Sequence, residues 1–226
     1  MPFFAAPVGI RVAGRPMVTA RASSSGFPKD YSAVVRDAQE ATQRAMQDGL
    51  RLLEVEFPVA SLMAVQGDEE GANEMTKSSE YLRQYARAFL DVASSTRVFF
   101  PDVKELELQA GGVWADFPSI NLDYLTKPSG LLDIGIDLSG YSPTSKIKPE
   151  ERVFLAAYPS FDPRELVAVD KVWRHIQNDE EKTLVIFNAE LCRLRSDYFP
   201  ALFYPEMARL SKDLIPAIET VYYVRT

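Results

Sequence analysis

Residues 153–187 read VFLAAYPSFDPRELVAVDKVWRHIQNDEEKTLVIF, and this stretch decides the fold class. It begins and ends with short, continuous apolar runs, which are typical of strands that are buried on both faces. Between them, Asp162, Pro163 and Glu165 supply an N-cap, a first-turn proline and a capping-box acid, so a helix should begin there. The order strand, helix, strand predicts two parallel strands joined by a right-handed crossover.

Helices and strands also alternate on either side of this unit. Residues 32–49 have apolar side chains at helical spacing and end at Gly49, and residues 50–57 alternate like a strand with one dry face. Further helices are expected over about 74–93 and from 205, and further strands over 97–101, 183–187 and 220–224. The predicted fold is α/β, with a mostly parallel sheet and helices on both faces, Rossmann-like but without a dinucleotide fingerprint.

Other parts of the chain give weaker signals. Residues 66–73 are acidic and contain glycine, which favours a loop. Leu106 and Leu108 alternate with acids, which predicts a further short strand. Residues 111–149 are rich in glycine and proline, so we expect loops there, with strand-like character only over 131–138.

The first 29 residues differ in composition from the rest. They hold four basic residues, Arg11, Arg15, Arg21 and Lys29, and no acidic residue, with a series of serines near the end. This composition predicts a disordered, cleavable transit peptide, with the chloroplast as the expected address and the mitochondrion as the alternative. Residues 30–226 are then expected to form a single α/β domain, truncated at its C-terminal strand.

Charge and cysteine content limit the partners. The whole chain has a net charge of −7, and without the first 29 residues 21 basic side chains face 32 acidic ones. Such an excess of acid opposes nucleic acid as a partner. One cysteine, Cys192, and one histidine, His175, do not make a His/Cys metal site, and no apolar run is long enough for a transmembrane segment. Peripheral membrane association is left open.

No catalytic, metal-binding or cofactor-binding motif stands in the sequence. The phosphate-binding, dinucleotide-binding, hydrolase and metalloprotease signatures are all missing. In an open parallel sheet, ligands bind at the carboxyl ends of the strands. Ser160 and Asp162 follow one predicted strand, and Asn188 and Glu190 follow the next, so these four are the candidate ligand-binding residues. Each also has a structural interpretation, as a helix cap or a turn residue.

Four stretches carry a resemblance to a known family: Leu52–Pro58, Val153–Pro159, Leu184–Leu191 and Glu219–Arg225. In this order they resemble the plant, algal and cyanobacterial domain-of-unknown-function family that includes the chloroplast Low Photosystem II Accumulation three protein. The resemblance covers about residues 32–226 and implies a stromal or thylakoid-peripheral protein that assists photosystem II assembly by protein–protein contact. The alternative is a nucleotide- or sugar-phosphate-binding enzyme that uses the carboxyl ends of the parallel strands.

Overall fold

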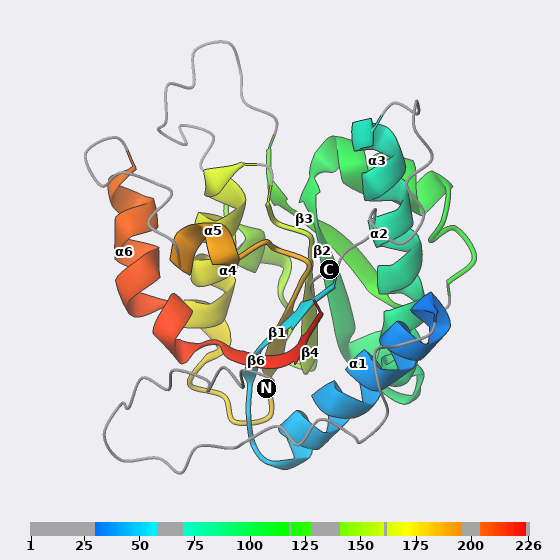
Figure 1. Cartoon of the computed structure of the whole chain (residues 1–226), viewed down its shortest axis with the longest axis horizontal. Coiled ribbons are helices and arrows are strands. Elements are labelled where there is room, and N and C mark those ends of the chain that lie inside the picture. The colour runs from blue at the N-terminus through cyan, green and yellow to red at the C-terminus, as the bar shows by residue number, and fades with distance from the viewer. Residues whose placement is uncertain are drawn as a thin grey trace, which may run out of the picture.

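The computed structural model describes residues 30–57, 70–117, 119–127, 141–160, 162–195 and 204–224. Two sequence-based predictions lie outside these residues: the transit peptide over 1–29 and the strand-like segment over 131–138. The described residues form one six-stranded sheet with helices packed against it (Figure 1).

All strand pairs of the sheet are parallel, and the strand order is β3-β2-β4-β5-β1-β6. The order differs from that of dinucleotide-binding Rossmann domains. The strands are β1 (Leu52–Glu56), β2 (Thr96–Asp102), β3 (Asn121–Thr126), β4 (Val153–Ala157), β5 (Thr183–Phe187) and β6 (Glu219–Tyr223). The predicted fold class, α/β with a parallel sheet, is confirmed, and so is the parallel pairing of β4 with β5.

Helices cover both faces of this sheet (Figure 1). One face carries α1 (Tyr31–Gln47), α2 (Glu70–Ala86) and α3 (Val103–Gly111), and the other carries α4 (Pro163–Ile176), α5 (Cys192–Arg195) and α6 (Pro205–Asp213). Three 3-10 helices complete the described chain: η1 (Arg87–Ser95), η2 (Pro143–Lys146) and η3 (Ile215–Ala217). Alternate residues of the central strands therefore enter two separate apolar cores, and β4 and β5 are buried along their whole length.

The helix start and stop signals act as expected. Asp162 caps α4, and its Oδ1 accepts the N–H of Arg164 at 2.9 Å. Asp30 caps α1 in the same way through the N–H of Ala33. Gly49 follows α1 with φ of 80°, a left-handed conformation that glycine adopts without steric strain.

Three local predictions are wrong. Residues 103–111, which contain Leu106 and Leu108, form α3 and not a strand, because Asp102 caps a helix there and Leu108 points to solvent. The loop expected over 66–73 already contains the first turn of α2 from Glu70, and its earlier part lies outside the described residues. The stretch 111–149 contains the strand β3, which was not predicted because Asp123 made it look polar, although Asp123 is buried.

The expectation for β1 needs a further correction. Its alternation of Leu and Glu predicted one dry and one wet face, but Glu54 is completely buried. The reason is tertiary: helices cover both faces of the sheet, and Arg195 of α5 and Thr220 of β6 bind the Glu54 carboxylate. Glu54 is consequently held inside the protein and Glu56 is half-buried, and both lie beside the residues that follow β5.

Candidate functional site

The carboxyl ends of β4 and β5 hold most of the unusual backbone of the described chain. Four of the described non-glycine residues have positive φ, and three of them lie here: Tyr158 at 34°, Asn188 at 51° and Glu190 at 50°. A left-handed conformation costs a non-glycine residue about 1 kcal/mol or more, and such residues cluster at functional sites. This edge of the sheet is therefore the first candidate for a binding site.

Asn188 joins the end of β5 to the end of β1. Its backbone N–H donates to the carbonyl of Val55 at 2.8 Å, and its Oδ1 accepts the N–H of Phe57 at 3.0 Å. The residue is only 7% exposed, and its Nδ2 is buried without a hydrogen-bond partner in the described part of the chain. An unsatisfied buried donor costs about 1–3 kcal/mol, so Nδ2 is a group that a bound acceptor would stabilise.

Glu56 lies at the same place, at the end of β1. Its Oε2 accepts the backbone N–H of Glu190 at 3.1 Å. Burial raises the pKa of Glu56 to about 7, and the negative charges of Glu54 and Glu190 add to this effect, while the N–H bonds from Glu190 and Ala189 oppose it. A carboxyl group with this pKa can take up or release a proton near neutral pH.

Glu54, two residues earlier on β1, is fully engaged. Its carboxylate oxygens accept Nη1 and Nη2 of Arg195 at 2.9 and 2.7 Å, and the hydroxyl of Thr220 also donates to it. This buried carboxylate thus ties together β1, α5 and β6. The single cysteine, Cys192, is exposed at the start of α5.

The other two candidate residues form a separate group after β4. Asp162 binds its own helix: Oδ1 caps the N–H of Arg164, and Oδ2 accepts Nε of Arg164 at 2.8 Å. Partial burial raises the pKa of Asp162, but the hydrogen bonds and charge of Arg164 outweigh burial and lower it. Ser160 donates its backbone N–H to Tyr158 at 2.8 Å.

The four candidates therefore divide into two pairs. Asn188 and Glu190 meet β1, whereas Ser160 and Asp162 belong to the connection between β4 and α4. A role for any of them in ligand binding stays a prediction.

Sequence reasoning missed a buried polar network beside β4. The hydroxyl of Tyr158 donates to Glu105 at 2.8 Å, and Nε2 of Gln109 donates to the same oxygen at 2.9 Å. Ser79 then donates to Gln109 at 2.6 Å and accepts Nε1 of Trp114 at 3.0 Å. Burial and the charge of Glu105 raise the pKa of Tyr158. Because the groups satisfy one another, the network fastens α2, α3 and β4 together.

At three described positions of the carboxyl edge, a carboxylate of the chain already accepts a backbone N–H group of the kind that holds phosphate. Phosphate binds at helix N-termini and loops whose backbone N–H groups point toward the ligand. Here Asp102 accepts such an N–H at the start of α3, Asp162 at the start of α4, and Glu56 after β5. The chain's own carboxylates thus take one N–H group at each of these positions, and their negative charge opposes an anion there.

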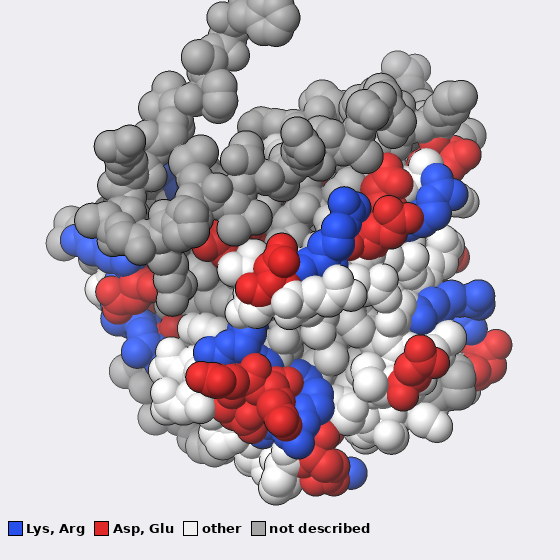
Figure 2. Space-filling model, turned by 90° about the horizontal axis from the view of Figure 1, so that it is seen from below, with Lys and Arg blue, Asp and Glu red and all other residues white. Residues whose placement is uncertain are grey.

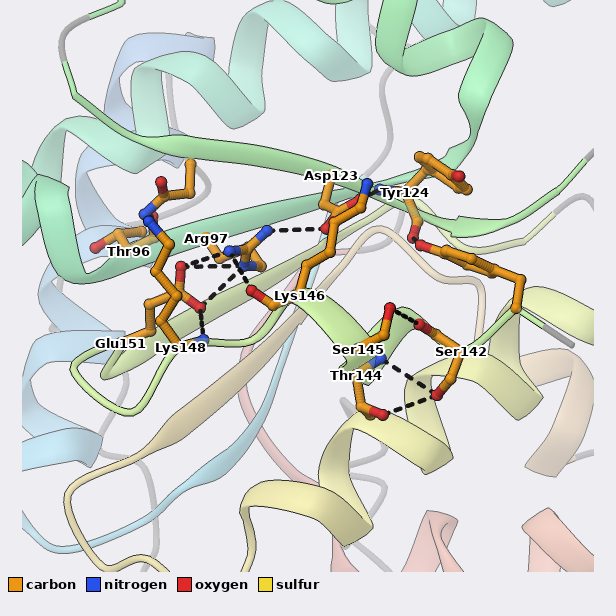
Figure 3. Close-up of polar contacts among 12 residues, drawn as sticks. Thr96, Arg97, Asp123, Tyr124, Ser142, Thr144, Ser145, Lys146, Lys148 and Glu151 are labelled. Atoms are coloured by element: carbon orange, nitrogen blue, oxygen red, sulfur yellow. Dashed lines mark hydrogen bonds and ion pairs between the residues drawn. The ribbon is translucent and has the colours of Figure 1, made fainter.

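At the opposite edge, a buried ion cluster surrounds Arg97 of β2 (Figure 3). Its guanidinium donates to both oxygens of Glu151, to Asp123 at 2.9 Å and to the carbonyl of Lys146 at 2.8 Å. Lys146 also pairs with Asp123 through Nζ, at 3.2 Å. These donors and acceptors are used within the cluster, and ligands of parallel sheets bind at the other edge. We assign the cluster to stability.

The described residues contain no group of three or more His, Cys, Asp or Glu side chains that could hold a metal ion. Within the same residues, no helix is both long enough and apolar enough to cross a membrane.

The fold and the carboxyl edge together define an α/β protein with an all-parallel sheet and a candidate site of carboxylates and one buried amide. Residues 28–226 match the family described as domain of unknown function DUF1995, and the chain belongs to this family. No curated protein and no solved structure matches the chain. The resemblance seen in the sequence is confirmed at the level of a domain-of-unknown-function family.

Proposed function

We propose that this protein is a chloroplast factor that assists assembly of photosystem II and acts by protein–protein contact. The resemblance to the family that includes the Low Photosystem II Accumulation three protein supports the process. The acid-free composition of residues 1–29 supports the chloroplast address. Neither observation depends on the candidate site.

The chemistry of the carboxyl edge favours a function by protein contact over the binding of a small phosphorylated molecule. Asp102, Asp162 and Glu56 each accept a backbone N–H group at this edge, and their negative charge opposes a nucleotide or sugar phosphate bound there. The charge distribution also opposes extended polyanions. Figure 2 shows acidic and basic side chains interspersed on one face, with no broad patch of one sign there.

The test is affinity isolation of the tagged mature protein from chloroplasts, combined with a knockout. We expect photosystem II assembly intermediates to be enriched over an unrelated stromal protein carrying the same tag. We also expect the knockout to accumulate less photosystem II. Recovery of no photosystem II component, together with normal photosystem II in the knockout, would overturn the proposal.

The address has its own test. Residues 1–29, fused ahead of a fluorescent protein, should direct it into chloroplasts, and N-terminal sequencing of the mature protein should show that they are removed. A fusion that stays in the cytosol or enters mitochondria contradicts the proposed location.

A second candidate function, a nucleotide- or sugar-phosphate-binding enzyme, has one specific observation in its favour. The buried Nδ2 of Asn188 has no partner in the described structure and lies beside a carboxyl group that titrates near neutral pH. A thermal-shift screen of nucleotides and sugar phosphates tests it, because a ligand at 100 times its Kd adds about 2.7 kcal/mol of stability. A shift that disappears in Asn188→Ala would favour this function, and no shift with any ligand would leave it without support.

A further inference from the structure

A groove of about 650 Å³ lies on the outer surface between α1 and the end of α2 with the start of η1. Figure 1 shows α1 beside α2 on this side of the sheet. Its size falls within the range of sites that hold small ligands or short peptide segments. Six long polar side chains line most of it: Arg36, Gln39, Gln43, Arg83, Gln84 and Arg87.

The groove is basic, although the whole chain is acidic. Arg36, Arg83 and Arg87 line it, against one acid, Glu40, which pairs with Arg44 at 3.6 Å. Arg36 and Arg87 are exposed and make no hydrogen bond or ion pair within the described part of the protein. Two guanidinium groups are therefore available at the groove in a chain of net charge −7.

Arg83 is held differently, in the wall of the groove. Its Nη2 pairs with Asp116 at 2.7 Å, and its guanidinium lies over the ring of Phe117, 5.3 Å from the ring centroid. These contacts fix Arg83 in place and leave the other two arginines to meet a partner. Arginine binds carboxylates through two parallel N–H groups, which gives direction as well as affinity.

Two glutamines of α1 form the polar floor. Nε2 of Gln39 donates to the carbonyls of Gln84 and Tyr85 at 2.9 and 3.1 Å, and Nε2 of Gln43 donates to that of Ala88 at 3.4 Å. These bonds tie the two helices together across the groove. They also fix the orientation of the amides, and each Oε1 accepts no hydrogen bond within the described part of the chain, so it can accept one from a ligand.

We propose that this groove binds an acidic peptide segment of a partner protein. Guanidinium groups complement its carboxylates, and the glutamine Oε1 atoms complement its backbone N–H groups. Phosphate offers carboxylate-like acceptors but no backbone N–H donors, and the acidic chain as a whole repels nucleic acid. The inference deepens the proposed function, on which it rests for taking a protein as the occupant.

The test uses the full-length protein and a fluorescein-labelled peptide of alternating glutamate and alanine. Binding is followed by fluorescence anisotropy at low ionic strength. We expect Arg36→Gln with Arg87→Gln to weaken binding about tenfold or more, equivalent to about 1.4 kcal/mol. The matched control is Arg152→Gln with Lys171→Gln, which removes the same charge from exposed basic residues outside the groove. It should change the affinity by less than about twofold.

Four results would overturn the inference: no binding by the wild type, unchanged binding by the groove variant, an equal loss in the control, or full competition by inorganic phosphate. Circular dichroism of each variant checks that it is folded. The groove and the proposed function can fail separately. Peptide binding without photosystem II association would retain the groove and reject the assembly role, and the reverse result would place the assembly contact on another surface.

Discussion

Arg97 should be one of the most sensitive positions for stability. Its side chain is 5% exposed, and its carboxylate partners Asp123 and Glu151 are 1% and 0% exposed. Arg97→Met keeps most of the apolar stem but removes every guanidinium bond. Of its described partners, Glu151 then retains only the N–H of Lys148, at 2.9 Å, and Asp123 retains its pair with Lys146 and the backbone N–H of Tyr124.

The magnitude follows from the charge left behind. Breaking a buried ion pair by removing one partner costs about 3–5 kcal/mol, because the remaining charge stays desolvated. For a domain of this size, each kcal/mol lowers Tm by about 2–4 °C, so we expect a decrease of about 10 °C. Urea unfolding followed by circular dichroism measures the same loss at constant temperature.

The next arginine in the chain provides the control. Arg152 pairs with Glu181 at 2.9 Å, but both side chains are largely exposed, at 39% and 71%. Arg152→Met should therefore cost less than about 1 kcal/mol. If Arg97→Met costs no more than Arg152→Met, the buried cluster does not stabilise the fold as argued.

A double variant separates charge from packing. Adding Glu151→Gln to Arg97→Met replaces the uncompensated carboxylate with a neutral amide of similar size, and the double variant should recover about 1–2 kcal/mol. Simple addition of two losses would mean that the two side chains contribute independently, which contradicts the bonds between them.

Three further predictions concern other parts of the fold. Glu56→Gln should stabilise the protein by about 1–2 kcal/mol at pH 8 and have little effect at pH 4, as measured by urea unfolding at each pH. The raised pKa of Glu56 means that the folded state binds the proton more tightly than the unfolded state, so the wild type loses stability as the pH rises from 4.5 through about 7. Gly49→Ala should cost about 1 kcal/mol through backbone strain alone, because φ is 80° while no atom lies within 4 Å of the added Cβ to clash with it. An unchanged Tm would contradict this. Tyr85→Phe should lower the free energy of unfolding by about 1–2 kcal/mol, because the 2.6 Å hydrogen bond to Thr42 is lost. A gain in stability would show that burying the hydroxyl costs more than this hydrogen bond contributes.

The sequence was sufficient for the layers of the fold. Continuous apolar runs at 153–157 and 183–187 indicated strands buried on both faces, and the cap at Asp162 placed the helix between them. These signals are local, since capping and periodicity depend on residues within a few positions of one another. Helix α3 was not predicted because it is short and because Leu106 and its exposed Leu108 alternate with acids as in a strand.

The order of the strands in the sheet could not be predicted from such local signals. β1 lies between β5 and β6, whose residues are more than a hundred positions away in the chain. A strand with Glu54 and Glu56 looks half-exposed until Arg195 and Thr220 are placed beside it. Likewise, β3 looks like a loop until Arg97 supplies the charge that lets Asp123 be buried. Polar residues whose partners are distant in sequence thus hide strands from pattern analysis.

The same reasoning explains the candidate site. The sequence predicted that Asn188 and Glu190 follow a strand, and in the structure they bind Phe57 and Glu56 at the end of β1. This pairing could not be predicted, because the two segments are far apart in the sequence. With Glu56 ionised, the N–H of Glu190 binds a carboxylate supplied by the chain itself. As Glu56 becomes protonated below about pH 7, that negative charge is lost and the edge becomes less repulsive to an anion. An anion bound at this edge should therefore bind more tightly below pH 7 in the wild type, and Glu56→Gln should remove that pH dependence.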